Sequence, residues 1–403
     1  GACGRHSGKN LSVGVQKNME DRIYFDNGST SWPKAPGVAE AVSELLTNGA
    51  FNINRGNYTG AYEVAGVVLD TRDKLAEMFQ VQDSRRVIFT PGVTCSLNYF
   101  IKGFLKEGDH VLVTGLEHNA VMRPLYQMTR KGVTYDVIPV DEQGNLDPAH
   151  AESLIRPETK AMIVSHASNV CGTVVPIEDL GEICERRQLF FVVDTAQTAG
   201  TLPVDMQRMK IDMLAFAGHK GLLGPQGIGG FVISDALGQK MEPFIAGGTG
   251  SQSDLLKMPT CLPDKYESGT MNLPGIVGLH AALSYLTKTG IDLLREKKME
   301  LTGYFLERVK ELDGVRIVGR PDLKSRVAVV SLDFLKMDNA VTAFELERRA
   351  GIMTRVGLHC APLAHQSFGT FPKGTVRFAF SACNTRKEID ICIEVMKELL
   401  ANS

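Results

Sequence analysis

The sequence lacks several features that would each indicate a special class of protein. No apolar run approaches the roughly 20 residues that a membrane-spanning helix needs. The formal net charge is only -2, so charge by itself attracts neither nucleic acid nor a membrane surface. We find no internal repeat and no low-complexity linker. These absences favour an ordinary soluble globular protein.

Cysteine is present, but not in the spacing that signals metal binding. The eight cysteines include no C-x-x-C pair, and the first twenty residues lack an apolar core followed by a cleavage site. We therefore expect a reducing, cytoplasmic setting and assign no metal site. Because residues 1–18 are polar and patternless, we expect Met19 to be the true start and the residues before it to be a poorly ordered extension.

The order of the apolar patterns predicts an α/β fold. The 403 residues suffice for two domains or for one large domain with a smaller lobe. Short apolar runs alternate with segments of helical period, which predicts a mainly parallel sheet between helices. From about Ile276, long amphipathic stretches predict a smaller α+β domain reached by a long helix. We expect a segment near the active site at 19–35, a large domain at 36–275 and a small domain at 276–403.

Polar residues follow the predicted strands. In such sheets the ligand lies beyond the carboxyl ends of the strands, so we expect these residues to share one pocket. Each alone has a plain alternative, since a loop histidine is usually solvated and an aspartate after a strand usually caps the next helix. The residues are Thr90–Thr94, Glu117, His118, His166, Asn169, Asp194–Gln197, His219 and Lys220.

This set matches the needs of pyridoxal phosphate. Lys220 supplies the amine that an aldehyde needs for a Schiff base, and Asp194 supplies a carboxylate that keeps the ring nitrogen protonated. The turn PGVT and the helix that opens near Thr94 offer backbone N–H groups and a hydroxyl for the phosphate. Gln197 can hydrogen-bond the ring hydroxyl, and His118 can stack on the open face of the ring.

The glycines around Lys220 have a physical reason in this interpretation. A tight turn without side chains lets the lysine reach the cofactor and brings the backbone close to it. A dinucleotide-binding loop is the competing interpretation of GPQGIGG. It fails on direction, because these glycines precede the strand FVIS, whereas a nucleotide-binding motif follows a strand and opens a helix.

With these residues identified, the chain resembles the class V aminotransferase family, and within it the cysteine desulfurase and selenocysteine lyase group. The likeness runs from Ile23 to the last helix. Its motifs, in the family's order, are TPGVT, LEHNAV, HASNVCGT, VVDTAQ, GHKGLLGPQGIGG, ESGTMN, RVGLHCAP and VRFAFSACNT. The resemblance implies the fold type I of pyridoxal-phosphate enzymes and a homodimer with active sites at the interface. The cofactor site that it implies consists of Lys220, Asp194, Gln197, His118, Asn169, Val93, Thr94, His219 and Thr249, the last reaching the neighbour's phosphate.

The resemblance also implies how the substrate is held. Arg377 would grip its carboxylate with two parallel hydrogen bonds, and Asn27, Arg55 and Arg355 are further candidates nearby. Cys360 matches the family's sulfur-accepting position, in a loop-like HCAP stretch where a cationic neighbourhood favours the thiolate. We interpret Cys184, Cys383 and Cys392 as small buried apolar residues.

The function that follows is removal of sulfur from L-cysteine to give alanine. Lys220 would remove the alpha proton, Cys360 would attack the substrate's sulfur to become a persulfide, and His118 would carry a proton. A thiol or a protein would then accept the sulfur. No nucleic-acid or membrane partner is expected.

Four positions depart from the family's pattern. Ala217 stands where the family often has a serine, which removes one hydroxyl from the phosphate site. Cys95 replaces a glutamate, while Asn54 and Tyr58 replace two histidines of some relatives. These changes leave the cofactor prediction intact and leave open which sulfur or selenium compound is used.

Other functions remain open at this point. A selenocysteine lyase, or a lyase that eliminates the beta substituent of cystine or cysteine without a persulfide, would use the same cofactor. True transamination would give Cys360 no task. A catalytically inactive subunit that binds a partner is the alternative outside enzymology, although the assembled site argues against it.

Overall fold

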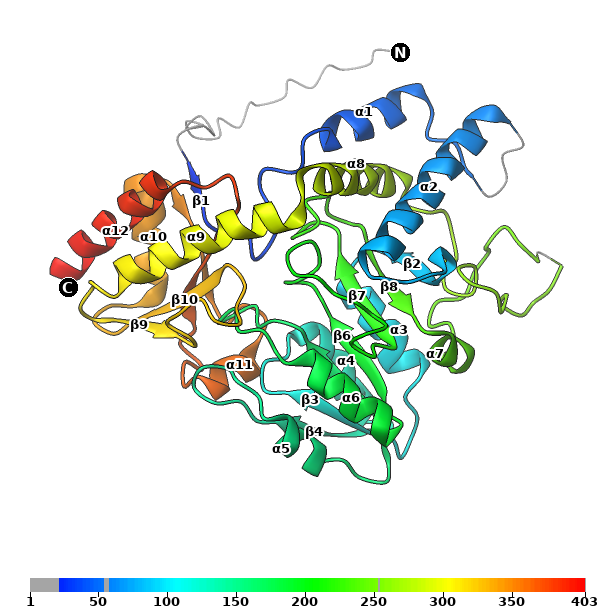
Figure 1. Cartoon of the computed structure of the whole chain (residues 1–403), viewed down its shortest axis with the longest axis horizontal. Helices are drawn as coiled ribbons and strands as arrows, with labels where there is room; N and C mark the ends of the chain where they lie inside the picture. Colours follow the sequence, from blue (N-terminus) through cyan, green and yellow to red (C-terminus); the bar gives the residue numbers. More distant parts are fainter. Residues whose placement is uncertain (1–21, 54–57, 253, 403) are drawn as a thin grey trace, which may run out of the picture.

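The computed structural model describes residues 22–53, 58–252 and 254–402, and a seven-stranded sheet forms the centre of this part of the chain (Figure 1). The strand order is β2-β8-β7-β6-β5-β3-β4. β8 runs antiparallel to both its neighbours, and the other pairs are parallel. The strands are β2 (Val87–Thr90), β3 (His110–Thr114), β4 (Thr134–Ile138), β5 (Thr159–Ser165), β6 (Phe190–Asp194), β7 (Met213–Ala217) and β8 (Gly229–Ile233).

Helices cover both faces of this sheet, because alternate residues of its strands point to two separate apolar cores. One core contains residues of α2, α6 and α8, and the other contains residues of α3, α4 and α7. The bounds are α1 (Val38–Asn48), α2 (Thr59–Met78), α3 (Val93–Gly103), α4 (Asn119–Thr129), α5 (Pro148–Ser153), α6 (Ile177–Arg187), α7 (Asp235–Lys240) and α8 (Leu273–Thr289).

A smaller α+β unit completes the described chain, with its own apolar core (Figure 1). Its antiparallel sheet has the order β12-β13-β10-β9, and β1 pairs with β11 in a separate two-stranded ribbon. The elements are β1 (Ile23–Tyr24), α9 (Ile291–Val309), β9 (Val315–Val318), β10 (Val329–Phe334), α10 (Asn339–Ala350), β11 (Ile352–Met353), β12 (Arg355–Gly357), α11 (Pro362–Ser367), β13 (Thr375–Ala379) and α12 (Arg386–Ala401).

These findings confirm the predicted α/β fold and refine the connection between its two parts. The expected single long helix is two helices, α8 and α9, that meet at Gly290, whose φ of 89° suits glycine.

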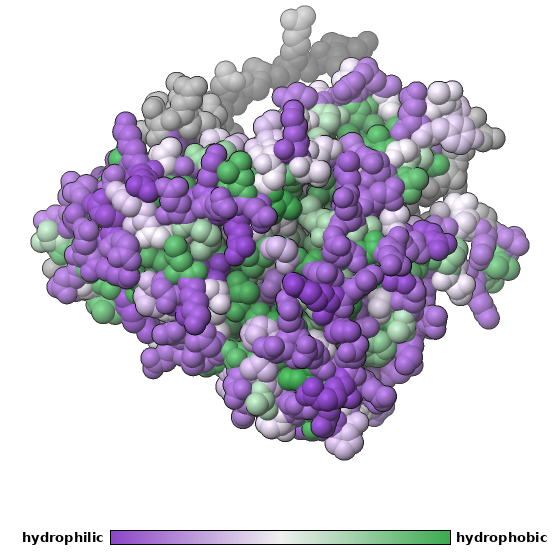
Figure 2. Space-filling model, viewed as in Figure 1, coloured by the Kyte–Doolittle hydropathy of each residue, from purple (hydrophilic) through white to green (hydrophobic). Residues whose placement is uncertain are grey.

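Residues 1–18, Asn54 and Arg55 lie outside the described residues. The face drawn in Figure 2 is mostly hydrophilic. Among the described helices, none combines the length and apolar character needed to cross a membrane.

Candidate active site

The turn that carries Lys220 packs against the turn that follows Asp194. Asp194 ends β6, and Lys220 follows the adjacent parallel strand β7. A Cβ atom on Gly221 would stand 2.3 Å from the carbonyl oxygen of Ala199. Only a residue without a side chain lets these two turns approach so closely, which explains the glycine after the lysine.

Lys220 and Asp194 line one cavity of ≈ 550 Å³ beyond the carboxyl ends of the strands. The cavity therefore lies where an open α/β sheet is expected to bind its ligand. It brings together residues from six separate stretches of sequence. The predicted cofactor-site residues on its wall are Val93, Thr94, His118, Asn169, Asp194, Gln197, His219 and Lys220.

Burial shifts the pKa values of both Lys220 and Asp194. It lowers the pKa of Lys220 to about 8, and Arg377 lowers this pKa further while Asp194 acts in the opposite direction. A minority of Lys220 amines is therefore neutral near pH 7, as a nucleophile or base requires. Burial raises the pKa of Asp194, against the hydrogen bond from the Ala196 amide, 2.8 Å from Oδ1. A protonated ring nitrogen facing this carboxylate would stabilise its charge.

The first turn of α3 forms another part of the cavity wall. No side chain caps this helix at its N-cap residue, Gly92, so its first N–H groups and its dipole can serve an anion. Thr94 lies in this turn, and His219 lines the same cavity. An amine, a buried carboxylate and an open helix start in one cavity fit pyridoxal phosphate, which requires a partner for its aldehyde, ring nitrogen and phosphate.

His118 is held in one neutral form. It is the N-cap of α4, where its Nδ1 accepts a hydrogen bond of 2.9 Å from the Ala120 amide. In the neutral ring the proton therefore resides on Nε2. Burial, followed by the positive charges of Lys220 and Arg355, lowers the pKa of His118 to about 4. A neutral imidazole can lie flat on an apolar ring without the cost of burying a charge.

The loop of Cys360 belongs to the small unit but is tied to the cavity wall. Asn169 Nδ2 donates to the carbonyl oxygen of His359 over 2.7 Å, and the Asn119 amide donates to that of Cys360 over 2.7 Å. His359 and Cys360 have φ of 49° and 57°, in the left-handed region. Cys360 is exposed and is not on the wall of the cavity itself. The structure thus sets it beside Asn119, the residue after His118.

Two arginines meet at the hydroxyl of Ser29. Arg355 NH1 and Arg377 NH2 donate to Ser29 Oγ over 3.0 and 2.8 Å, and Ser29 Oγ donates to Asp26 Oδ1 over 2.8 Å. Arg355 NH2 also approaches Cys360 Sγ at 3.4 Å. The two arginines face each other across β12 and β13. Sequence reasoning missed Ser29 and Asp26, although both lie in the stretch IYFDNGSTSWPKAP, where the resemblance to the family begins.

Arg377 is buried and already engaged. Its NH2 pairs with Asp26 Oδ1 at 3.0 Å, and its NH1 donates to the Asn169 carbonyl oxygen at 3.1 Å. Within the described residues its Nε has no hydrogen-bond partner. A Cβ on Gly28 would stand 3.0 Å from Arg377 Cζ, so any larger residue would require the guanidinium to shift by a few tenths of an ångström. Its grip on a substrate carboxylate stays a prediction.

Glu117 has no predicted role, yet it lies fully buried close to Asp194. It accepts hydrogen bonds from Thr114 Oγ1 at 2.6 Å and from the amide and hydroxyl of Ser165 at 2.9 and 2.7 Å. Burial raises its pKa to about 7, and the charge of Asp194 adds to the rise. Ser165 is the β5 partner of Asp194. Its position after an apolar strand predicted that Glu117 shares the pocket, but it does not line the described cavity and instead bonds to Ser165, which does.

Several predicted residues lie elsewhere. Thr90, His166 and Thr195, expected in the shared pocket, are buried but do not line the described cavity. Asn27 lines a neighbouring cavity, where its side chain bonds to backbone atoms of Ala379 and Trp32. Thr249 is buried and hydrogen-bonded within its own loop, and its reach to a neighbouring subunit's phosphate stays a prediction. The prediction that Cys383 is buried is wrong, because it follows the end of β13 in a turn and is exposed; Cys184 and Cys392 are buried as expected.

The departures from the family's pattern are unevenly placed. Ala217 and Cys95 line the cofactor cavity, so both changes face the predicted ligand. Tyr58 is exposed at the start of α2 and does not line this cavity. Burial raises the pKa of the Cys95 thiol, which keeps it neutral beside the phosphate position.

Comparisons with known proteins agree with this geometry. The model of the family described as aminotransferase class-V matches residues 23–392. Probable cysteine desulfurases of Methanothermobacter thermautotrophicus and Pyrococcus abyssi are 31% and 32% identical to this chain in sequence. Each alignment covers 94% of this chain and 95% of the relative. An apo cysteine desulfurase structure from Thermococcus onnurineus is 31% identical, with a TM-score of 0.89 over 95% of this chain and 96% of that one. The chain belongs to the class-V aminotransferase family, in its cysteine desulfurase group.

Proposed function

We propose that this protein is a pyridoxal-phosphate-dependent cysteine desulfurase that takes sulfur from L-cysteine onto Cys360. The observation that carries the proposal is the attachment of the Cys360 loop to the cofactor cavity through Asn169 and Asn119. An aminotransferase would need Lys220 and Asp194 but would have no use for a thiol held there. The relatives named as probable cysteine desulfurases support the same conclusion.

The residues of the cavity divide the work. Bound pyridoxal phosphate would supply an electrophilic aldehyde and a ring that stabilises negative charge at the substrate's alpha carbon. Lys220, with its lowered pKa, would hold the aldehyde and take the alpha proton. Asp194 would keep the ring nitrogen protonated, and the start of α3 with Thr94 and His219 would bind the phosphate.

Sulfur transfer would take place at the exposed loop. The Cys360 thiolate attacks the substrate sulfur, so an S–S bond forms while the bond from the substrate's beta carbon to sulfur breaks. The beta carbon takes up a proton in place of sulfur, a proton returns to the alpha carbon, and alanine leaves. Arg355 NH2 lies 3.4 Å from Cys360 Sγ and can donate a hydrogen bond that orients this sulfur. The exposure of Cys360 suits later transfer of the sulfur to a thiol or protein acceptor.

We also propose that the protein is a homodimer with its active sites at the interface. In this dimer Thr249 of one subunit would bind the cofactor phosphate of the other.

The test is to incubate the cofactor-loaded protein with L-cysteine and to measure alanine together with the mass of the Cys360 peptide. A desulfurase releases alanine and adds one sulfur atom to that peptide. Cys360→Ser should lose both, while Cys261→Ser, which removes another exposed thiol, should keep both. Release of pyruvate instead of alanine, undiminished in Cys360→Ser, would identify a β-eliminating lyase and refute the proposal.

A further inference from the structure

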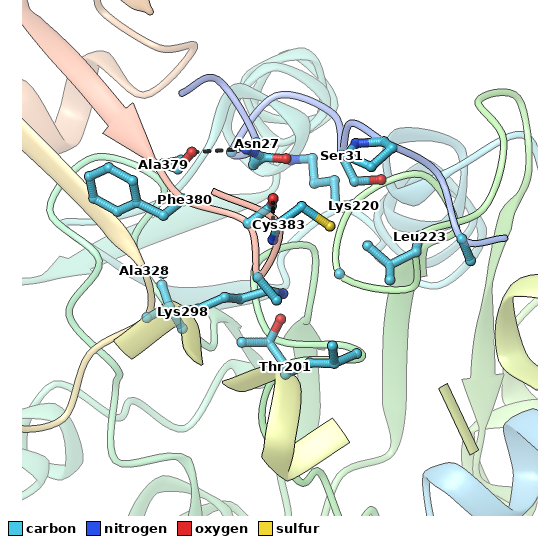
Figure 3. Close-up of a pocket in the computed structure, with 18 of the residues that line it drawn as sticks. Asn27, Ser31, Thr201, Lys220, Leu223, Lys298, Ala328, Ala379, Phe380 and Cys383 are labelled. Carbon is cyan, nitrogen blue, oxygen red and sulfur yellow. Dashed lines mark hydrogen bonds between the residues drawn. The ribbon is translucent and has the colours of Figure 1, made fainter. Parts of the chain in front are cut away.

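A second cavity of ≈ 250 Å³ lies beside the cofactor cavity (Figure 3). The two share Ala196, Gln197 and Lys220. The second one extends between the N-terminal segment, the start of α9 and the turn after β13. Cys383, which is exposed, also lines it, so the cavity can be reached from solvent.

The charges on its wall have one sign. Lys34, Lys220 and Lys298 line the cavity, and its described lining includes no aspartate or glutamate. Figure 3 shows the side chains of Lys220 and Lys298 extending into the space from different sides. Among the described residues, no carboxylate lies within salt-bridge distance of these three amines. Lys34 Nζ instead donates to neutral oxygens, including Ser31 Oγ at 3.2 Å and the His219 carbonyl at 3.1 Å.

Burial makes these amines costly to keep charged. It lowers the pKa of Lys34 and of Lys298 to about 8, and the nearby Cys383 sulfur opposes this shift for Lys298. An anion that entered the cavity would stabilise their charged forms. A neutral ligand would offer no such compensation, so the wall distinguishes ligands by charge.

The rest of the wall is mainly apolar, with a few neutral polar side chains such as Gln197 and Thr201. Its larger apolar side chains are Leu223, Tyr285, Leu294 and Phe380. An apolar cavity of about 150 Å³ accommodates benzene. A cavity of ≈ 250 Å³ therefore has room for a ring of that size with a carboxylate attached. A strongly hydrated ion such as phosphate would leave this apolar surface without contacts.

We propose that this cavity binds a small organic monoanion, with its carboxylate at Lys298 and its apolar body against Leu223 and Tyr285; the charge of Lys34, whose three N–H groups donate to Thr30, Ser31 and the His219 carbonyl, adds to the positive potential. The site is separate from the one that holds the substrate, although the occupant would lie next to Lys220. No assigned role of Lys298 or Lys34 accounts for their position. The inference does not depend on the reaction that the cofactor cavity performs.

Benzoate and benzamide provide the test, since they differ in charge and hardly in shape. Binding to the cofactor-loaded protein is measured by titration calorimetry and by the fluorescence of Trp32, the sole tryptophan, which directly precedes Pro33 on the wall. We expect saturable benzoate binding, at least about tenfold weaker binding in Lys298→Met, and little binding of benzamide. Lys298→Arg should keep most of the affinity, and Lys297→Met, which removes an exposed neighbouring charge, should change nothing.

Three results would overturn the proposal. These are equal binding of benzoate and benzamide, an unchanged affinity in Lys298→Met, and no saturable binding of benzoate at all. L-Alanine is the control for the substrate site: it should not displace benzoate from the unmodified, cofactor-loaded protein. Circular dichroism and thermal unfolding of each variant separate a lost site from a lost fold.

Discussion

The two sides of the active site are built differently. Asp194 ends one strand and Lys220 follows the adjacent one, in a sheet that is buried on both faces, and close backbone contacts fix the turns after these strands. Cys360 stands on an exposed loop of the small unit, with left-handed backbone at two successive residues and two hydrogen bonds to the cavity wall. Proton and electron chemistry needs fixed distances, whereas a sulfur carrier must also meet an acceptor. The contrast predicts that changes on the two sides have separable effects.

The largest effect is expected from Lys220→Ala. It removes the amine that holds the cofactor and takes the alpha proton, so we expect turnover to fall at least about 1,000-fold and the visible absorbance band of the loaded protein to disappear. Alkylation of Cys360 by iodoacetamide should continue at the original rate, because its loop is untouched. A slowed alkylation would show that the two sides are not independent.

Arg355→Ala tests the other side. It removes the donor to Cys360 Sγ and one of the two donors to Ser29 Oγ. We expect alkylation of Cys360 and sulfur transfer to slow by about tenfold, with the cofactor's absorbance unchanged. Arg348→Ala, which removes an exposed arginine of α10, is the matched control. A changed absorbance in Arg355→Ala would contradict the separation.

Glu117→Gln tests how much stability the protein loses when a buried carboxyl next to the sheet ionises. Burial raises the pKa of Glu117 to about 7 in the folded protein, from 4.5, so the native state holds this proton more tightly than the unfolded state. The contribution of Glu117 to the free energy of unfolding is therefore present below about pH 4.5 and is lost as pH rises through about 7.

The glutamine variant does not ionise and escapes this loss. Its free energy of unfolding, relative to the unmodified protein, should rise across that interval by up to roughly 3 kcal/mol. Urea unfolding at several pH values measures the difference. Glu142→Gln, which alters an exposed carboxyl, should show no comparable rise.

The smallest effect is expected from Ser29→Ala. It removes the oxygen at which Arg355 and Arg377 meet, but leaves the ion pair of Arg377 with Asp26. We expect KM for L-cysteine to rise about threefold to tenfold, with kcat nearly constant. A fall in kcat alone would show that Ser29 acts on the reacting atoms and not on the two arginines.

Much of the sheet side could be predicted from the sequence. Apolar runs such as LFFVVDTA predict buried parallel strands, and parallel strands place their carboxyl ends at the same edge of the sheet. Lys220, Asp194, Gln197 and His118 could be grouped by that rule before any coordinates were considered, and all four line the same cavity. The residues of the loop side lack such a rule, since Ser29 and Arg355 are 326 positions apart.

The sequence by itself determined the α/β order, the family motifs and the identity of the cavity residues, because hydrophobic period and strand direction are local properties of the chain. Tertiary structure alone decided that Ser29 joins two arginines, that Glu117 is buried close to Asp194, and that three lysines share a second cavity whose described lining includes no carboxylate. Those features depend on burial and on contacts between distant segments, and both arise only when the sheet, the N-terminal segment and the small unit pack together.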